Sequence, residues 1–495
     1  MRLRGWLSGS IMSRMADLTR QRRREQRAEK KRRGLPLLHF FYQADDPYSH
    51  LLAQILPGLL TQFHLQCLFH LVPPGQDEMV PERAMLDVHA MRDAAAIAPW
   101  YGLAFEERWH PPRQELLGIA QCILSLPRAT IDPELPARVG QALWQDDAIA
   151  MQSLAAAYGF ADVATSLQTL LKGDRDRSKL GHYLGGTLHF EGTCYHNIDR
   201  VHYLQTRLVA RGLLRVERDA LRMILPARKS AGSGPVEAVR QYSASQAANT
   251  GQTSATGAFD KRHAEAGDRH GGHPGSTELA EVHMAAPVVL EFFASLRSPY
   301  TYLAIERVMA LCQRYRLRVM LRPVLPMVMR GLPVPMQKGA YIMMDAAREA
   351  QVLGVPFGKV FDPVGKPVER AYSLFDWVRG QGQELAFFHA LLRAAFAEGR
   401  DIYAKSTLKS IIAVLNLDWY EAENLLDNRE WEEEVEQNRL DLEAVQCWGV
   451  PGFILRRPGV EQPMCVAWGQ DRLWLIEEIL LQSGSAISAE VTGGG

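Results

Sequence analysis

Cysteine is scarce in this chain, and long hydrophobic runs are missing altogether. The six cysteines in 495 residues include no C-x-x-C pair, so a disulfide framework is excluded. This usage is typical of a reducing compartment, and we expect a cytoplasmic protein. No run reaches the 18 apolar residues of a membrane-spanning helix, and the stretch GWLSGSIM is too short for the apolar core of a secretory signal.

The formal net charge is zero, but basic and acidic residues are unevenly distributed along the chain. Residues 2–33 contain twelve Lys or Arg and three acids, whereas the remaining chain has 44 basic and 53 acidic residues. A basic segment of this kind can bind nucleic acid or a membrane surface. A solvated and partly helical tail is the simpler interpretation, and we predict such a tail over residues 1–34.

Large apolar residues become rare between positions 226 and 285, where Gly, Ser, Ala, Thr and Gln dominate. Such a segment cannot bury enough surface to offset its ordering entropy, which predicts a flexible linker. Its histidines are expected to be solvated rather than metal ligands, and we predict no metal site. The linker separates predicted domains at 35–225 and 286–483, and residues 484–495 are predicted to be a disordered tail.

The two halves repeat one another. LPLLHFFYQADDPYSHLL and PVVLEFFASLRSPYTYLA align at a constant offset of 252 residues, without a gap as far as Val72 on Val324. Each copy predicts a strand, a helix that begins at a proline, and a second, parallel strand. GVPGFILRR with VAWGQDRLWLIEEIL, and LGGTLHFEG with YHNIDRVHYLQTRL, then predict a hairpin and a final helix. Long helical stretches lie between, so we expect an α/β fold in each half with a helical insertion.

Ser298 stands directly before Pro299, at the predicted N-terminus of a helix. Unpaired N–H groups and the positive end of the helix dipole favour negative charge there, including a thiolate. No base that would activate the serine is evident, so we expect it to donate a hydrogen bond to a thiolate that arrives with a cofactor. An ordinary N-cap is the structural alternative.

Two further elements follow near the end of the chain. A cis bond between Val450 and Pro451 would direct the main-chain groups of Val450 toward a peptide-like ligand, although a trans proline at a strand edge fits the motif equally well. Gln470 and Asp471 begin the last helix. They could bind a carboxylate and an ammonium group, or could simply cap the helix.

In this order and spacing, FFASLRSPYTYLA, LRPVL, AFFHALLRAAFAEGRDI, CWGVPGFIL and WGQDRL resemble the DsbA-like thioredoxin superfamily. The pattern is most similar to 2-hydroxychromene-2-carboxylate isomerases and kappa-class glutathione transferases. The resemblance covers residues 287–482, and a weaker copy covers residues 35–225, which implies two tandem thioredoxin-like domains.

The resemblance also implies glutathione as the cofactor and a glutathione-dependent isomerase or transferase as the activity. It assigns Ser298 to the glutathione thiolate, Val450 and a cis Pro451 to main-chain pairing, and Gln470 and Asp471 to the γ-glutamyl end. The family's isomerases add the thiolate to a conjugated substrate, allow a bond rotation and eliminate the thiol. A further polar contact of the family has no obvious counterpart in PMVMRGLPVPMQKG.

The first half departs from this pattern. Asp46 stands where the second half has Ser298, and Gly185 where it has Pro451. A carboxylate would repel a thiolate, so we interpret this half as a degenerate partner domain. The two halves would then pair within one chain as an internal pseudo-dimer, and the protein could function as a monomer. Asp45 and Asp46 could instead bind a cation or act as an acid or base, but surface caps are the simpler interpretation.

Two other functions stay open from the sequence. One is a thiol–disulfide oxidoreductase without the usual C-x-x-C, for which Cys447 is the only cysteine with a path to the site, and the other is a non-catalytic binding or scaffold protein. The Met-rich segment 327–344 suits a small hydrophobic or aromatic electrophile as substrate, and ordinary helix packing is the alternative.

Overall fold

The computed structural model describes residues 2–31, 33–228 and 288–492, so most of the predicted linker lies outside the described residues. Each half contains one four-stranded sheet, in the orders β2-β1-β3-β4 and β6-β5-β7-β8. The strands are β1 (Leu37–Tyr42), β2 (Gln66–Leu71), β3 (Thr187–Phe190), β4 (Thr193–His196), β5 (Val289–Ala294), β6 (Arg318–Pro323), β7 (Gly452–Arg456) and β8 (Cys465–Trp468).

The two sheets have the same pairing and the same register. In each, the first strand pairs in parallel with the second and antiparallel with the third. The first pair begins at Leu37 with Gln66 in one sheet and at Val289 with Arg318 in the other. These positions are 252 residues apart, so the internal repeat predicted from the sequence is also a structural repeat.

Helices α3 (Pro47–Gln62) and α12 (Pro299–Tyr315) join the parallel strands, and both begin at the predicted proline. The first half continues with α4 (Arg83–Ile97), α5 (Gln114–Leu124), α6 (Arg128–Ile131), α7 (Leu135–Trp144), α8 (Ala148–Tyr158), α9 (Val163–Lys179) and α10 (Val201–Ala210). The second half continues with α13 (Met336–Leu353), α14 (Lys366–Tyr372), α15 (Phe375–Gly380), α16 (Glu384–Arg393), α17 (Lys405–Val414), α18 (Trp419–Leu425), α19 (Trp431–Ala444) and α20 (Leu473–Thr492). Helix α20 extends into the predicted disordered tail.

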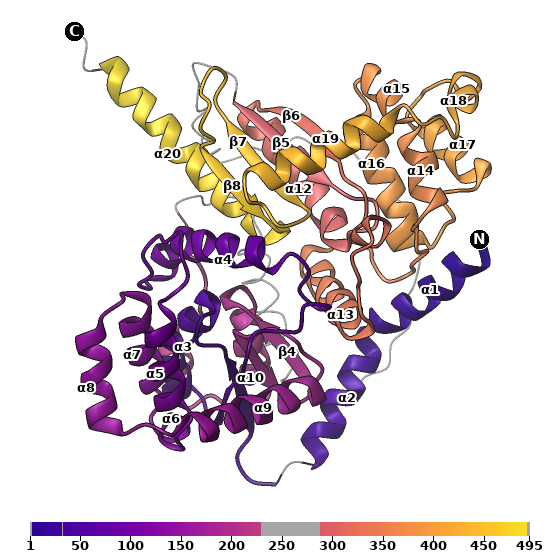
Figure 1. Cartoon of the computed structure of the whole chain (residues 1–495). Helices are drawn as coiled ribbons and strands as arrows, with labels where there is room; N and C mark the ends of the chain where they lie inside the picture. The colour runs from indigo at the N-terminus through magenta and orange to yellow at the C-terminus, as the bar shows by residue number, and fades with distance from the viewer. Residues whose placement is uncertain (1, 32, 229–287, 493–495) are drawn as a thin grey trace, which may run out of the picture.

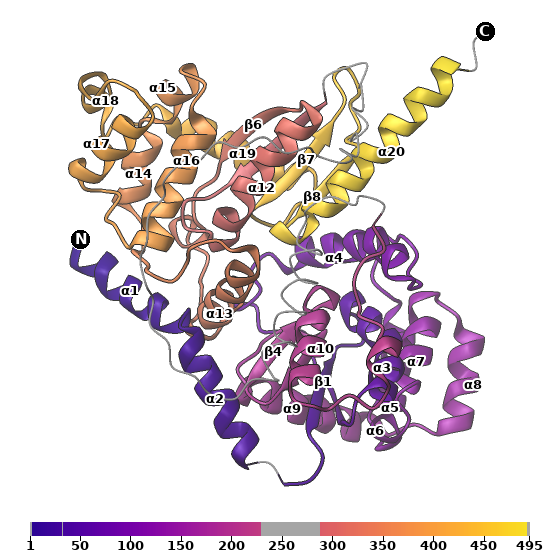
Figure 2. The same cartoon turned by 180° about the vertical axis from the view of Figure 1, so that it is seen from behind.

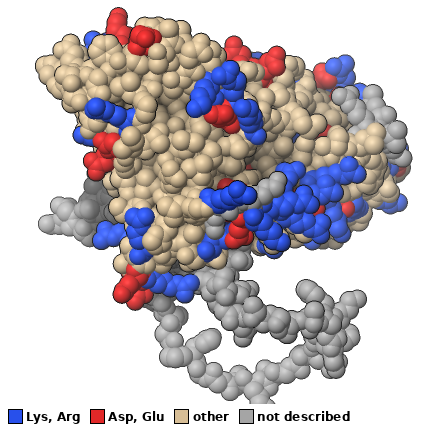
Figure 3. Space-filling view, turned by 90° about the horizontal axis from the view of Figure 1, so that it is seen from below, with Lys and Arg blue, Asp and Glu red and all other residues tan. Residues whose placement is uncertain are grey.

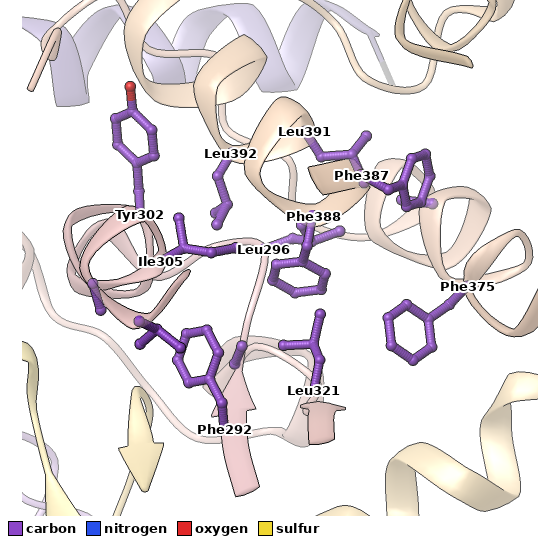
Figure 4. Packing of buried hydrophobic residues seen from close by; sticks show 14 of the residues in the cluster. Phe292, Leu296, Tyr302, Ile305, Leu321, Phe375, Phe387, Phe388, Leu391 and Leu392 are labelled. Carbon is purple, nitrogen blue, oxygen red and sulfur yellow. The ribbon is translucent and has the colours of Figure 1, made fainter. Parts of the chain in front are cut away.

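The core of the second half connects the sheet with the helical insertion. Phe292 of β5, Ile305 of α12 and Phe388 of α16 are almost completely buried and lie in one cluster (Figure 4). The insertion is therefore packed onto the sheet and forms one hydrophobic unit with it. No helix among the described residues is both long and apolar enough to cross a lipid bilayer.

The N-terminal segment does not form the solvated tail that its charge predicts. It folds into α1 (Arg2–Met15), which lies along α13, and α2 (Leu18–Lys31), which lies along the first half (Figures 1 and 2). Glu25 of α2 lies 3.4 Å from Arg207, and Glu29 pairs with Arg211. These acids of α2 thus face the protein, whereas its exposed residues include Arg22, Arg23, Arg24, Arg27 and Lys30. Figure 3 shows Lys and Arg side chains gathered on the face seen from below.

Candidate active site

A cavity of about 530 Å³ lies between the two halves. Ser298, Val450, Pro451, Gln470 and Asp471 all line it, so the structure brings the five residues singled out from the sequence to one place. Its volume is in the range of small-molecule sites. The first half also reaches this cavity, through the turn that begins α3 and through the loop before β3.

Ser298 is the N-cap of α12 and is half-buried. Its Oγ accepts a hydrogen bond from the backbone N–H of Thr301 at 3.1 Å. That bond uses the oxygen as acceptor and leaves the hydroxyl hydrogen, which has no acceptor among the described residues, available for a ligand. Capping and donation to a ligand are therefore compatible at this serine. In a C-x-x-C motif the cysteines are three residues apart, and here those positions carry Ser298 and Thr301.

The peptide bond between Val450 and Pro451 is cis, as the resemblance implies. The carbonyl of Pro451 accepts a hydrogen bond from Gly469 at 2.8 Å, which ties the loop to the turn before α20. Val450 lines the cavity, and its main-chain N–H and C=O have no backbone partner within the described chain. These two groups can pair with an extended peptide-like ligand.

The sheet register corrects one equivalence between the halves. Thr187 pairs with Phe41, and Gly452 pairs with Phe293 at the matching place in the second sheet. The residue before Thr187 is Gly186, which therefore stands where Pro451 stands. The sequence alignment had placed Gly185 there, one residue too early.

In the first half, the loop that contains Gly186 lies directly against the N-terminus of α3. Ser49 Oγ accepts from Gly186 N at 2.6 Å and donates to Asp46 Oδ2 at 2.6 Å. A Cβ at Gly186 would lie 2.8 Å from Asp46 Oδ2, which shows how closely the loop approaches. Burial and the nearby Asp45 carboxylate raise the pKa of Asp46 to about 6, although its hydrogen bonds from Ser49 act in the opposite direction. A negatively charged sulfur would meet an unfavourable charge beside Asp46.

Gln470 and Asp471 belong to a buried cluster of charges that joins the halves. Arg200 of the first half binds Asp471 through two bonds of 2.9 and 3.0 Å, and it also binds Asp345 of α13 at 2.9 Å. Gln470 is 2% exposed, and its amide donates to Glu349 at 3.0 Å. Both side chains are thus engaged with protein, but the Asp471 side chain is 27% exposed and is the more accessible of the two.

The same contacts recur with the halves exchanged. Arg472 of the second half binds Asp93 of α4 at 2.6 and 2.7 Å and Asp199 at 2.8 and 3.0 Å. Asp93 and Asp345 are 252 residues apart, and Arg200 and Arg472 each end the short turn before the last helix of their half. We call Arg200, Asp345, Asp471, Arg472, Asp93 and Asp199 the reciprocal arginine cluster.

This cluster holds strong charge in a buried place. Burial alone would raise the pKa of Asp345, but Arg200 and Arg348 outweigh burial and hold it well below its usual range. Tyr300, directly after Pro299, donates to Asp345 at 2.8 Å. The Ser298 turn is therefore linked through Tyr300 and Asp345 to an arginine of the other half.

Lys338 was missed in the sequence, although it lies in PMVMRGLPVPMQKG, the segment where a family contact could not be placed. It lines the cavity and is 4% exposed, and its Nζ donates to the carbonyl of Met79 at 2.9 Å. It also lies over the ring of Trp448, two residues before Val450. Burial lowers the pKa of Lys338 to about 8. A buried cation beside the Val450 loop is suited to a ligand carboxylate.

The cysteines near the cavity are not activated. Cys447 is completely buried, and burial raises its pKa to about 12. Cys465, on β8, has a pKa raised to about 12 for the same reason. A thiol of this kind is not ionised near neutral pH and is a poor nucleophile.

Comparison with known proteins identifies the fold of the second half. Residues 289–481 match the family model of the DSBA-like thioredoxin domain. The second half is thus a DSBA-like thioredoxin domain, as its motifs predict. No curated protein matches the chain.

Solved structures of this fold are also similar. A 2-hydroxychromene-2-carboxylate isomerase is 22% identical with a TM-score of 0.34, and the match covers 42% of this chain and 100% of that one. The cytosolic disulfide reductase DsbM from Pseudomonas aeruginosa is 21% identical with a TM-score of 0.32, covering 41% and 99%. The same reductase with GSH is 19% identical with a TM-score of 0.30, covering 40% and 99%. At these identities the likeness concerns the fold alone.

Proposed function

We propose that the protein is a glutathione-dependent isomerase or transferase that acts on a small hydrophobic electrophile. The observation that carries the proposal is the convergence of Ser298, Val450 and Asp471 on one cavity between the halves. Each offers a different chemistry, namely a hydroxyl donor, a pair of unpaired main-chain groups and a carboxylate. A γ-glutamyl tripeptide with a thiol needs these three partners.

The residues present fit glutathione at both of its charged ends. Asp471 accepts from Arg200, but a carboxylate has further lone pairs for an ammonium group. Arg200, supplied by the first half, lies beside it for the α-carboxylate of the same end. Lys338 would hold the glycine carboxylate, because it is a buried cation whose described hydrogen-bond partner is a neutral carbonyl. In this proposal Gln470 positions Arg307 and Asp471 rather than binding the ligand with its side chain.

Glutathione, when bound, supplies a thiolate that adds to a conjugated substrate and, in an isomerisation, leaves again after a bond has rotated. The protein would favour the ionised sulfur through the Ser298 hydroxyl and the N-terminus of α12. Val450 would hold the cysteinyl main chain so that the sulfur faces Ser298. Catalysis would then consist of stabilising negative charge and positioning the substrate.

A thiol–disulfide oxidoreductase is less well supported. It requires a cysteine with a lowered pKa at the helix start, and the equivalent places carry Ser298 and Asp46. The described cysteine nearest the Val450 loop, Cys447, has its pKa raised instead. A purely structural role leaves the donor groups of the cavity without a purpose.

Calorimetric titration with glutathione tests the proposal. We expect binding in the micromolar to millimolar range for the wild-type chain, weakened by about tenfold or more in Lys338→Met, where a charged hydrogen bond worth about 1.5–3 kcal/mol is lost. Lys366→Met is the matched control, because Lys366 pairs with Glu369 on the surface. Absence of heat at millimolar glutathione in the wild type would reject the proposal.

A further inference from the structure

The N-terminal helix α1 is attached to the second half through its smallest residues. A Cβ at Gly9 would lie 2.4 Å from the carbonyl oxygen of Val360, and one at Gly5 would lie 2.8 Å from the Phe361 ring. Ser13, one turn further, accepts a hydrogen bond from Val360 N at 2.9 Å. Gly5, Gly9 and Ser13 therefore form one side of the helix, and that side fits closely against the backbone at 360–362.

The adjoining side of α1 faces the cavity. Ile11, Met12 and Met15 line it together with Met336 and Met343 of α13. Ile11 is 42% exposed, whereas Met12 and Met15 are partly buried against the core of the second half. The cavity thus has an apolar wall made by two helices, one of which lies more than 280 residues before the Ser298 turn in the sequence.

This wall differs in chemistry from other parts of the cavity lining. Asp471, Arg200 and Lys338 provide the charged groups that suit the ends of glutathione, whereas Ile11, Met12 and Met15 carry no charge. Flexible methionine side chains adapt to apolar groups of irregular shape. A ligand that is polar at one end and apolar at the other would match this division.

We propose that α1 forms the electrophile subsite, so that Ile11, Met12 and Met15 determine the specificity for the apolar substrate. This inference rests on the proposed function, because it assumes that glutathione occupies the charged part. The substrate class is a hydrophobic electrophile whose apolar body lies against α1 and α13. The residues act by contact with the substrate and have no part in ionising the thiol.

S-hexylglutathione tests this subsite without any turnover, because its alkyl chain extends from the sulfur. The measurement is the ratio of the glutathione Kd to the S-hexylglutathione Kd, both by calorimetry on the full-length chain. Apolar burial favours the hexyl derivative, and we expect a ratio of about 10 or more in the wild type. In Gly9→Val, the added side chain collides with Val360, and undocking of α1 should lower the ratio at least about fivefold with the glutathione Kd unchanged.

A second variant keeps α1 docked. Ile11→Asn places an amide on the wall and leaves Gly5 and Gly9 in place, and it should lower the ratio by about threefold or more. Ser10→Val, on an exposed position of the same helix, is the control and should leave both Kd values unchanged.

The outcomes separate the two ideas. Unchanged ratios in Gly9→Val and Ile11→Asn, with glutathione still bound, would overturn the electrophile subsite and leave the proposed function standing. Absence of glutathione binding to the wild type would overturn both. An equal loss of both ligands in Ile11→Asn would also overturn the subsite, because α1 would then support the whole cavity rather than the apolar end.

Discussion

The reciprocal arginine cluster makes a quantitative prediction about how the halves hold together. Arg472 is 3% exposed and binds both Asp93 and Asp199, so Arg472→Met would leave two carboxylates buried beside an uncharged side chain. Removing one partner of a buried ion pair costs about 3–5 kcal/mol. Since 1.36 kcal/mol corresponds to tenfold, opening of the interface should become about 100-fold to 5,000-fold more frequent.

Cleavage by thermolysin under native conditions measures this opening, because the cleavage rate follows the population of the open form when closing is fast. Arg429→Met is the matched control, since Arg429 pairs with Glu432 at the surface and is 80% exposed. A surface pair contributes about 0–1 kcal/mol, so the control should change the rate less than about fivefold. Adding Asp93→Asn to Arg472→Met should restore part of the protection. Equal rates in Arg472→Met and Arg429→Met would refute the role given to the cluster.

Two predictions concern pH. Burial lowers the pKa of Lys338 to about 8, so the affinity for S-hexylglutathione, which has no thiol to ionise, should fall as the pH rises from 7 to 9. Lys338→Arg should remove this dependence, and a flat wild-type profile would contradict the assignment. Burial also lowers the pKa values of His50 and His89 to about 4, below the unfolded value of about 6.5. Both favour the folded state above pH 6.5 and lose this effect as the pH falls toward 4, about 2 kcal/mol each by pH 5. The urea midpoint followed by circular dichroism should therefore drop between pH 7.5 and 5, and a constant midpoint would show that these histidines are not buried neutral.

Much of the fold was accessible from the sequence because local patterns determine it. The apolar run before Ser298 becomes β5, and α12 begins at Pro299, as predicted, and buries an apolar side that includes Val308 and Leu311. The cis bond before Pro451 and the meeting of the late motifs at one cavity were implied by the resemblance to the DsbA-like superfamily, and the motifs alone left them open. The strand and the helix start depend on short segments whose neighbours are close in sequence.

The reciprocal arginine cluster was not predicted, although the sequence contains a signal for it. The offset of 252 residues continues past Val72 to align Asp93 with Asp345, and IDR aligns with QDR before the last helices. The exchange of arginines between halves depends on how the two sheets are docked, and no local pattern specifies docking. The docked position of α1 was also missed. The twelve basic residues near the N-terminus indicated a solvated tail, and nothing local marked Gly5 and Gly9 as packing residues.

The thiol pKa of bound glutathione tests the central claim most directly. The absorbance of the thiolate near 240 nm, titrated with glutathione in the complex, gives this value for the wild type, for Ser298→Ala and for Asp46→Ala, which removes the equivalent N-cap of the first half. The Ser298 hydroxyl and the start of α12 together should favour the thiolate by about 2–4 kcal/mol, which lowers the pKa by about 1.5–3 units. Ser298→Ala should raise the pKa by at least about one unit, and Asp46→Ala should leave it unchanged. A bound thiol with the same pKa in the wild type and Ser298→Ala would contradict the account.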